Sequence, residues 1–206
     1  MTGLRFLGVL AAIVAVCGDA FAASRQDLED CNKSFGDKGA AACSRVIEDA
    51  NENAANRANA YFNRGTWHDA RGQLDEAIRD YSEAIRLEPK NGDRYYIRAH
   101  AYRQKGDTEK ELADHNEAIR LSPRALHFIG RAYTYMRKGD FERAIADFST
   151  AIKTDPKWTN TWYQRAKAYT AMGDRQRAIA DYRMILKLDP SSIASREEIK
   201  RLGGTP

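Results

Sequence analysis

Residue types and motifs that usually carry catalysis are scarce in this sequence. Only 4 histidines and 3 cysteines occur in 206 residues. A His-Glu-x-x-His zinc motif, a Gly-rich phosphate loop and a Gly-x-Ser-x-Gly nucleophile motif are all missing. The chain also lacks a set of carboxylates that stands apart from its internal repeat. We therefore expect a protein that is not an enzyme and has no cofactor.

Concentrated positive charge is missing as well. The chain has 33 basic and 29 acidic residues, a net charge of +4, and the two kinds alternate along the sequence. Nucleic-acid-binding domains usually present a basic stripe or patch, so we expect no nucleic-acid partner. An apolar content of 43% is that of a globular chain, since disordered chains are poorer in apolar residues.

The first 22 residues are typical of a secretory signal peptide. Arg5 gives a positive start, Phe6 to Val16 form an uncharged and mostly apolar run, and Ala20-Phe21-Ala22 is a small-x-small cleavage site. The run has roughly half of the ~20 residues that a membrane-spanning helix needs. We predict cleavage after Ala22, which gives a periplasmic or secreted protein without a membrane span in its mature form.

Two alternatives for this segment stay open. One is a bacterial lipoprotein anchored through Cys17, although Val16 stands where such a signal has a small residue. The other is an uncleaved anchor, against which Asp19 and the short apolar run argue.

Removal of the signal peptide would leave two cysteines, Cys31 and Cys43, which are 12 residues apart. Cysteines of exported proteins are usually bridged, so we predict a disulfide between them. The alternative is a pair of small buried thiols. We expect no metal site, because two isolated cysteines without neighbouring histidines supply too few ligands.

Four glycines recur at a nearly constant spacing of 34, 33 and 34 residues: Gly72, Gly106, Gly139 and Gly173. Eleven residues before each glycine is an aromatic residue: Tyr61, Tyr95, Phe128 and Trp162. Each repeat closes with a proline: Pro89, Pro123, Pro156 and Pro190. Apolar residues at intervals of three, four and seven form a stripe on one side of a helix. Each repeat therefore predicts two helices, separated at the glycine and ended near the proline.

These repeats resemble the tetratricopeptide repeat (TPR) family, whose pattern of aromatic, small residue, Tyr, Ala, aromatic, Ala and Pro is met almost throughout 58–192. The cleanest copy consists of Trp162, Ala166, Tyr169, Gly173, Ala178, Tyr182 and Pro190. The departures are His68, Glu111, His115 and Ile185. We expect Glu111 and His115 to loosen the packing of the second repeat.

The resemblance implies an all-α fold, a right-handed α-solenoid in which stacked helix pairs share one core. After the signal peptide (1–22) we expect a degenerate helix pair (23–57), four repeats, and a C-terminal capping helix and tail (193–206). The four repeats are 58–91, 92–124, 125–158 and 159–192.

Both ends show adaptations of the repeat. Cys43 falls where Tyr81 stands in the first repeat, so a bridge to Cys31 would replace an aromatic contact. At the other end, Ser195 and Glu198 have the spacing of a capping box, which predicts the start of the final helix.

One arginine and one aspartate, sixteen residues apart, occur in every repeat: Arg64 with Asp80, Arg98 with Asp114, Arg131 with Asp147, and Arg165 with Asp181. Because the pair is present in all repeats, we interpret it as a structural ion pair between the two helices and not as a ligand site.

In the family, the first helix of each repeat lines the concave face of the solenoid. By this resemblance the candidate peptide-binding groove consists of Asn59, Phe62, Thr66, Asp93, Tyr96, His100, Arg103, Ile129, Tyr133, Met136, Arg137, Asn160, Tyr163 and Lys167. Asp69, Leu126 and Thr170 fall on the same face. Phe62, Tyr96, Ile129 and Tyr163 are equivalent and should form an apolar ladder, with Arg103, Arg137 and Lys167 beside it. The alternative is that some of these side chains pack on the neighbouring second helix and do not face the groove.

Aromatic residues, Met and Arg are enriched in contact surfaces, so we expect a non-catalytic scaffold that binds another protein or a peptide segment in this groove. The Lys and Asn positions of the family's carboxylate clamp fall on Phe62 and Thr66, which argues against that mode in the first repeat. The alternative function is an accessory structural subunit of a cell-envelope assembly machine for the outer membrane or cell wall. Homo-oligomers are compatible with either role.

Overall fold

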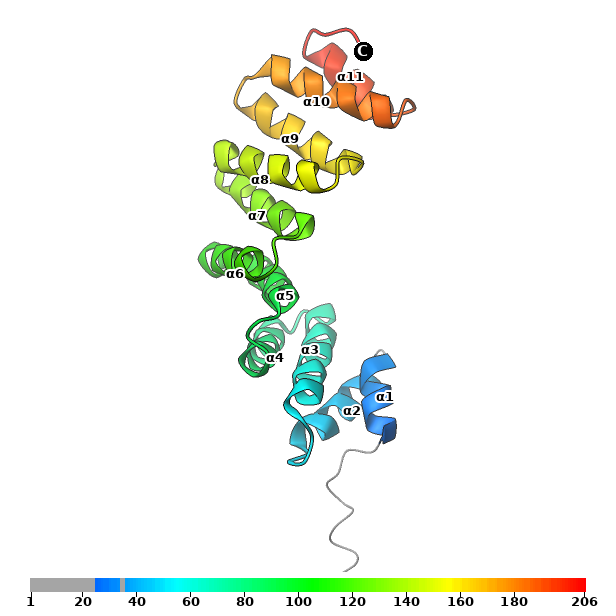
Figure 1. The fold of residues 1–206 in the computed structure, drawn as a ribbon, viewed down its shortest axis with the longest axis vertical. Helices are drawn as coiled ribbons and strands as arrows, with labels where there is room; N and C mark the ends of the chain where they lie inside the picture. The colour runs from blue at the N-terminus through cyan, green and yellow to red at the C-terminus, as the bar shows by residue number, and fades with distance from the viewer. Residues whose placement is uncertain (1–24, 34–35) are drawn as a thin grey trace, which may run out of the picture. The chain divides into compact units, whose positions relative to one another are not determined.

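The computed structural model describes residues 25–33 and 36–206, and this part of the chain contains eleven helices and no strand (Figure 1). The helices are α1 (Arg25–Lys33), α2 (Asp37–Glu48), α3 (Ala54–Ala70), α4 (Leu74–Leu87), α5 (Gly92–Lys105), α6 (Thr108–Leu121), α7 (Ala125–Lys138), α8 (Phe141–Thr154), α9 (Thr159–Ala171), α10 (Arg175–Leu188) and α11 (Ile193–Arg201). The all-α fold class is confirmed. The predicted signal peptide, 1–22, and Cys17 lie outside the described residues.

The chain forms two compact units. The N-terminal unit ends at Glu88 and contains α1–α4, and the C-terminal unit, Pro89–Pro206, contains α5–α11. In each unit every helix packs on the next, as in an α-solenoid. The start of the first repeat expected at residue 58 lies inside α3, because this helix begins earlier, where the Asn53 side chain accepts a hydrogen bond from the Asn56 N–H.

Each repeat turns at its glycine. The four glycines have φ angles of 73° to 79°, in the left-handed region that residues with a Cβ avoid. In three repeats the next residue is an aspartate whose side chain accepts a hydrogen bond from a backbone N–H in the first turn of the second helix: Asp107, Asp140 and Asp174. In the first repeat Gln73 stands there, and its side-chain oxygen lies 2.8 Å from Nδ1 of His68. The Gly-Asp dipeptide thus encodes most of the helix-to-helix turns.

Small residues allow the two helices of a repeat to approach closely around a buried aromatic ring. Tyr81, Phe148 and Tyr182 are at most 1% exposed, and alanines flank them in the core. At Gly65 in α3, an added Cβ would lie 2.9 Å from the ring of Tyr81 in α4. The small and aromatic residues of the repeat pattern therefore lie where the two helices of a repeat pack against each other.

The predicted ion pair is present in every repeat. Nε and one terminal nitrogen of each arginine donate to the two carboxylate oxygens of its aspartate at 2.7–2.8 Å: Arg64 to Asp80, Arg98 to Asp114, Arg131 to Asp147, and Arg165 to Asp181. The hydrogen bond to Asp147 raises the pKa of Arg131.

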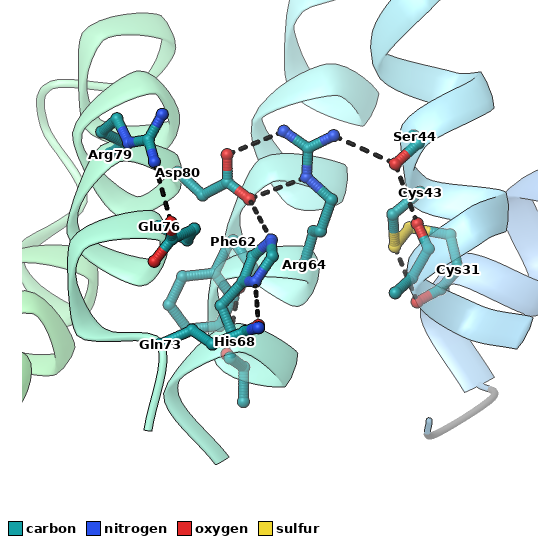
Figure 2. Close-up of polar contacts among 12 residues, drawn as sticks. Cys31, Cys43, Ser44, Phe62, Arg64, His68, Gln73, Glu76, Arg79 and Asp80 are labelled. Carbon is teal, nitrogen blue, oxygen red and sulfur yellow. Dashed lines mark hydrogen bonds and ion pairs between the residues drawn. A yellow bond between two sulfur atoms is a disulfide. The ribbon is translucent and has the colours of Figure 1, made fainter. Parts of the chain in front are cut away.

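The remaining arginine nitrogen reaches the preceding helix. In the N-terminal unit, Nη1 of Arg64 donates to Oγ of Ser44 in α2 at 3.0 Å (Figure 2). In the C-terminal unit, Arg131 and Arg165 donate in the same way to Asn116 in α6 and Ser149 in α8. One arginine thus connects three successive helices.

The N-terminal helix pair is closed by the two cysteines. Their sulfur atoms are 2.14 Å apart, as a disulfide between Cys31 in α1 and Cys43 in α2 requires. Both residues are buried in a small core with Ala42, Val46 and Ala60. Cys43 therefore occupies a core position, as its alignment with Tyr81 predicts.

The final helix, α11, begins earlier than the capping-box spacing predicts. Its cap is Ser192, whose side chain accepts a hydrogen bond from the N–H of Ser195. Ser195 itself is buried inside the helix, and Ile199 is fully buried against α10 residues such as Tyr182. The prediction that Ser195 caps this helix was wrong, because burial of Ile199 and Ser195 sets where the helix must run, and Ser192 then meets the first free N–H groups.

We expect replacement of Arg131 by Ala to lower the free energy of unfolding by about 2–3 kcal/mol, since it leaves the Asp147 carboxylate buried without its cation. Urea unfolding followed by circular dichroism measures this. Arg120→Ala is the matched control, because Arg120 belongs to an exposed pair with Glu117 and its loss should change stability little. Unchanged unfolding of Arg131→Ala would contradict a structural role for the pair.

Reduction of the disulfide should open the N-terminal helix pair selectively. Closure of such a short loop contributes at most about 3 kcal/mol in the chain-entropy model. Amide hydrogen exchange with and without a reductant should show faster exchange in α1 and α2 and unchanged exchange in α7–α10. The Cys31→Ala/Cys43→Ala variant should not respond to the reductant. Equal protection of α1 and α2 in both states of the wild type would argue against a stabilising bridge.

Candidate functional site

Two adjoining pockets lie along the first helices of the C-terminal unit. We call the smaller one, of about 190 Å³, the aromatic pocket; Tyr96, His100, Leu126, Ile129, Tyr133 and Trp158 are among the residues that line it. We call the larger one, of about 460 Å³, the basic pocket; it is lined by Arg103, Tyr133, Met136, Arg137, Gln164 and Lys167. Arg103 and Tyr133 line both, so the two pockets form one groove.

Helical spacing places these side chains together. Tyr96, His100 and Arg103 follow one another at intervals of four and three residues on α5, which puts them on one face. Tyr133 and Arg137 have the same relation on α7. Stacking of α5, α7 and α9 then brings residues that are more than 30 positions apart in sequence to one surface.

The floor of the aromatic pocket is a cluster of rings around Tyr96. Its ring centroid lies 4.6 Å from that of His100, 5.7 Å from His115 and 5.3 Å from His127. Burial raises the pKa of Tyr96. The Tyr133 hydroxyl at the pocket wall accepts a hydrogen bond from the Asn160 amide at 3.1 Å, so α7 and α9 are tied at the site.

Gly130 lets α7 approach this cluster. A Cβ at this position would lie 2.5 Å from Cε1 of His115 and 2.8 Å from the Tyr96 ring. Any side chain here would therefore displace His115 or Tyr96 and close the pocket.

His115 and Glu111, the two departures from the family pattern in the second repeat, are polar groups that line the pocket from α6. Each is 1% exposed. Oε1 of Glu111 accepts a hydrogen bond from Oγ1 of Thr134 at 2.7 Å, and its other oxygen forms an ion pair with Arg137. An arginine and a threonine of α7 therefore compensate the buried carboxylate of the second repeat.

His115 is held neutral by its surroundings. Burial lowers its pKa to about 3, and electrostatic interactions with His100, His127, Arg103 and Arg131 act in the same direction. Oε1 of Glu111 lies 3.9 Å from Nε2 of His115, which is too long for a hydrogen bond. Nδ1 of His115 is buried and has no hydrogen-bond partner among the described residues.

Three cations surround the basic pocket. Arg137 is held by Glu111, whereas Arg103 has only a long 3.5 Å contact to Nδ1 of His100. Neither Arg103 nor Lys167 has a carboxylate partner within the described part of the chain. The pocket therefore carries net positive charge.

Three residues of the C-terminal unit that were predicted to line the groove make contacts with other parts of the fold. Ile129 is 6% exposed and belongs to the core with Ala132, Ala144 and Phe148, so it is not the exposed rung of a ladder that the resemblance implied. Asp93 pairs with Arg124 and His127. Tyr163 packs against Tyr182, with ring centroids 5.5 Å apart. Ile129 and Tyr163 thus pack on the second helices α8 and α10, and Asp93 contacts α7 and the residue before it.

In the N-terminal unit, Phe62 and Thr66 line a separate cavity of about 580 Å³ formed by α1, α2 and α3. Phe62 also contacts Tyr81, with centroids 5.6 Å apart. Asn59 is exposed on α3. The cavity also contains Trp67 and both cysteines, so it owes its shape to the degenerate N-terminal pair.

Sequence reasoning missed five contributors to the groove: Glu111, His115, Gly130, Trp158 and Gln164. Glu111 and His115 carried a signal, because both break the family pattern in the same repeat. Gly130 stands in mid-helix, which also marks a close approach. Trp158 and Gln164 carry no comparable signal.

Models of the TPR repeat match residues 70–106 and 132–173, and models of the tetratricopeptide repeat match 92–125 and 159–192, together more than half of the chain. The chain belongs to the tetratricopeptide repeat family. Members of this family act as protein-interaction scaffolds and are generally non-catalytic. A search of curated protein sequences finds no significant match to this TPR protein.

Solved structures agree on the fold. YrrB, described as a TPR protein with an unusual peptide-binding site, is 18% identical with a TM-score of 0.66, over 85% of this chain and 84% of that one. MamA from Desulfovibrio magneticus is 18% identical with a TM-score of 0.65, over 71% and 84%. A tetratricopeptide repeat protein from Parabacteroides merdae is 21% identical with a TM-score of 0.67, over 70% and 58%. At these identities the likeness concerns the fold alone.

Neither a membrane span nor a metal site is found among the described residues. No helix there combines the length and apolar character needed to cross a bilayer. No group of three or more His, Cys, Asp or Glu side chains is placed to hold a metal ion in that part of the TPR protein.

His115 should make the stability of the protein depend on pH. Its pKa is about 3 when folded and about 6.5 when unfolded. Between these values the unfolded chain binds more protons, so this residue lowers stability as the pH falls below about 6.5. The loss in the free energy of unfolding that is due to His115 is at most roughly 1.4 kcal/mol for each pH unit.

The His115→Phe variant isolates this contribution, because aromatic residues occupy the equivalent positions of the other repeats. Urea unfolding at pH 7 and pH 5 should show the variant gaining stability relative to the wild type at the lower pH. Parallel pH profiles for the two proteins would mean that His115 is not held neutral.

Proposed function

We propose that the C-terminal unit binds a segment of another polypeptide in the groove formed by the aromatic and basic pockets. The observation that carries this proposal is that most residues lining these pockets lie on the first helices and outside the repeat pattern. Pattern residues such as Ala132 and Phe148 serve the core, whereas the groove residues are chemically different in each repeat. Such variation on a constant scaffold is how repeat proteins create specific binding surfaces.

The chemistry of the groove supports a protein ligand. Tyr, Trp, Met and Arg, which line it, are the residue types enriched in contact surfaces. Trp158 is 41% exposed and would lose much of its exposed area under a bound segment. The apolar side chains would provide most of the affinity, and the cations would orient an acidic part of the partner.

We also propose that the protein is non-catalytic and is exported to the periplasm or secreted. The absence of catalytic motifs from the sequence supports the first point. The signal-peptide pattern and the bonded geometry of Cys31 and Cys43 support the second. The mass of the protein purified from its native cells, together with its N-terminal residue, tests the second point: a chain that starts at Ala23 is expected, and one that retains Met1 would contradict it.

The binding role is tested by affinity capture from an envelope extract with the wild type and the double variant Arg103→Glu/Lys167→Glu. Both side chains are exposed, so the variant should fold normally, unlike one that alters the buried Ile129. We expect a specific partner to be retained by the wild type and reduced at least ten-fold on the variant, as measured by quantitative mass spectrometry.

Lys153→Glu/Lys187→Glu is the matched control. It makes the same change of charge on the second helices α8 and α10, at exposed residues that line neither pocket. It should retain the partner as the wild type does. Equal retention by the groove variant would show that binding does not use this surface.

A further inference from the structure

We infer that the groove recognises an internal peptide segment in which one aromatic or branched apolar side chain stands beside two acidic side chains. This inference rests on the proposed function and specifies the chemistry of the partner.

The aromatic pocket has the size of one side chain. Its volume is about 190 Å³, and an apolar protein cavity of about 150 Å³ is known to accept benzene. Leu126, Ile129 and Trp158 line the aromatic pocket together with the ring of Tyr96. A ring or a branched aliphatic group therefore fits against these apolar side chains.

The charge of the basic pocket sets the number of acidic groups. Arg103, Arg137 and Lys167 bring three positive charges, and the buried carboxylate behind them, Glu111, neutralises one through its ion pair with Arg137. Two positive charges remain. Two ligand carboxylates would balance them, and guanidinium groups bind carboxylates with two parallel hydrogen bonds.

The residues shared by the two pockets determine the spacing between the apolar and the acidic side chains of the ligand. Because Arg103 and Tyr133 line both, the acidic groups must lie close to the apolar anchor. Neighbouring residues of an extended segment, about 3.3 Å apart along the chain, meet this condition. The free carboxylate of a chain end would by itself leave one positive charge unmatched, so an internal segment is favoured.

Glu111 is the positioning residue in this arrangement. It fixes the Arg137 guanidinium from behind, since it is buried and is itself held by Thr134. The acidic residue that departs from the family pattern thereby orients a cation toward the ligand without occupying the groove.

The test is selection of end-blocked, random ten-residue peptides on the immobilised protein, with the enriched sequences read by mass spectrometry. The wild type should enrich peptides with Phe, Tyr, Leu or Ile next to Asp or Glu. Replacement of both acidic residues of an enriched peptide by their amides should weaken binding roughly ten-fold in fluorescence polarisation, since exposed ion pairs contribute up to about five-fold each.

The Arg103→Glu/Lys167→Glu variant is the decisive comparison, because it changes the net charge of the pocket from two positive to two negative. It should enrich the same apolar anchors next to Lys or Arg. Such a gain of preference cannot come from misfolding. Lys153→Glu/Lys187→Glu should select as the wild type does.

The other outcomes separate the two proposals. If the enriched peptides lack acidic residues, or if the charge-reversed variant keeps the wild-type preference, this inference is overturned and the groove still binds peptides. If binding requires an unblocked C-terminus, as a parallel library shows, the ligand is a chain end and the internal segment is wrong. If the wild type enriches no peptide, the proposed function fails together with the inference.

Discussion

A planar arginine fork between successive helices is the interaction on which the arrangement of this protein depends. Arg131 illustrates it: two of its nitrogens bind Asp147 of its own repeat, and the third binds Asn116 of the preceding helix. The donors of a guanidinium are fixed in one plane. Within the C-terminal unit one helix pair therefore has little freedom to rotate against the next, and α5, α7 and α9 present corresponding faces to one side. A groove can form only because this alignment is kept.

The close contact of paired helices leaves room for few kinds of side chain, and the second repeat shows how a departure is accommodated. His115 fills the space of an aromatic ring, and Gly130 on α7 provides the gap that it needs. Glu111 fills the space of an alanine, and Arg137 and Thr134 on α7 compensate its charge and hydrogen bonds. Packing and charge were thus adjusted across one helix interface. The ion pair with Glu111 also holds Arg137 at the basic pocket. Arg137 therefore both compensates a buried charge and lines the groove.

Much of the fold was predictable because its rules are local and repeated. The glycine spacing gave the helix-to-helix turns, and the Arg and Asp residues gave the ion pairs. The differences lie where the repeats end: α3 begins at Ala54, before the expected start of the first repeat at residue 58, and Ser192, not Ser195, caps α11. Cap positions depend on which residues the neighbouring helix buries, here Ile199 and Ser195, and no repeat copy marks that boundary.

For the groove, the sequence by itself determined which helices could line it, since a constant repeat places the first helices in equivalent positions. It also determined the excess of cations at Arg103, Arg137 and Lys167. Only the tertiary structure decided which of these side chains interact with other parts of the fold. Ile129 is buried in the core, Asp93 pairs with Arg124 and His127, and Tyr163 packs against Tyr182. The physical reason is that equivalent positions face different neighbours in each repeat. The burial of a side chain and the partner that it binds depend on both residues of a contact. They cannot be predicted from the position of one residue in its repeat.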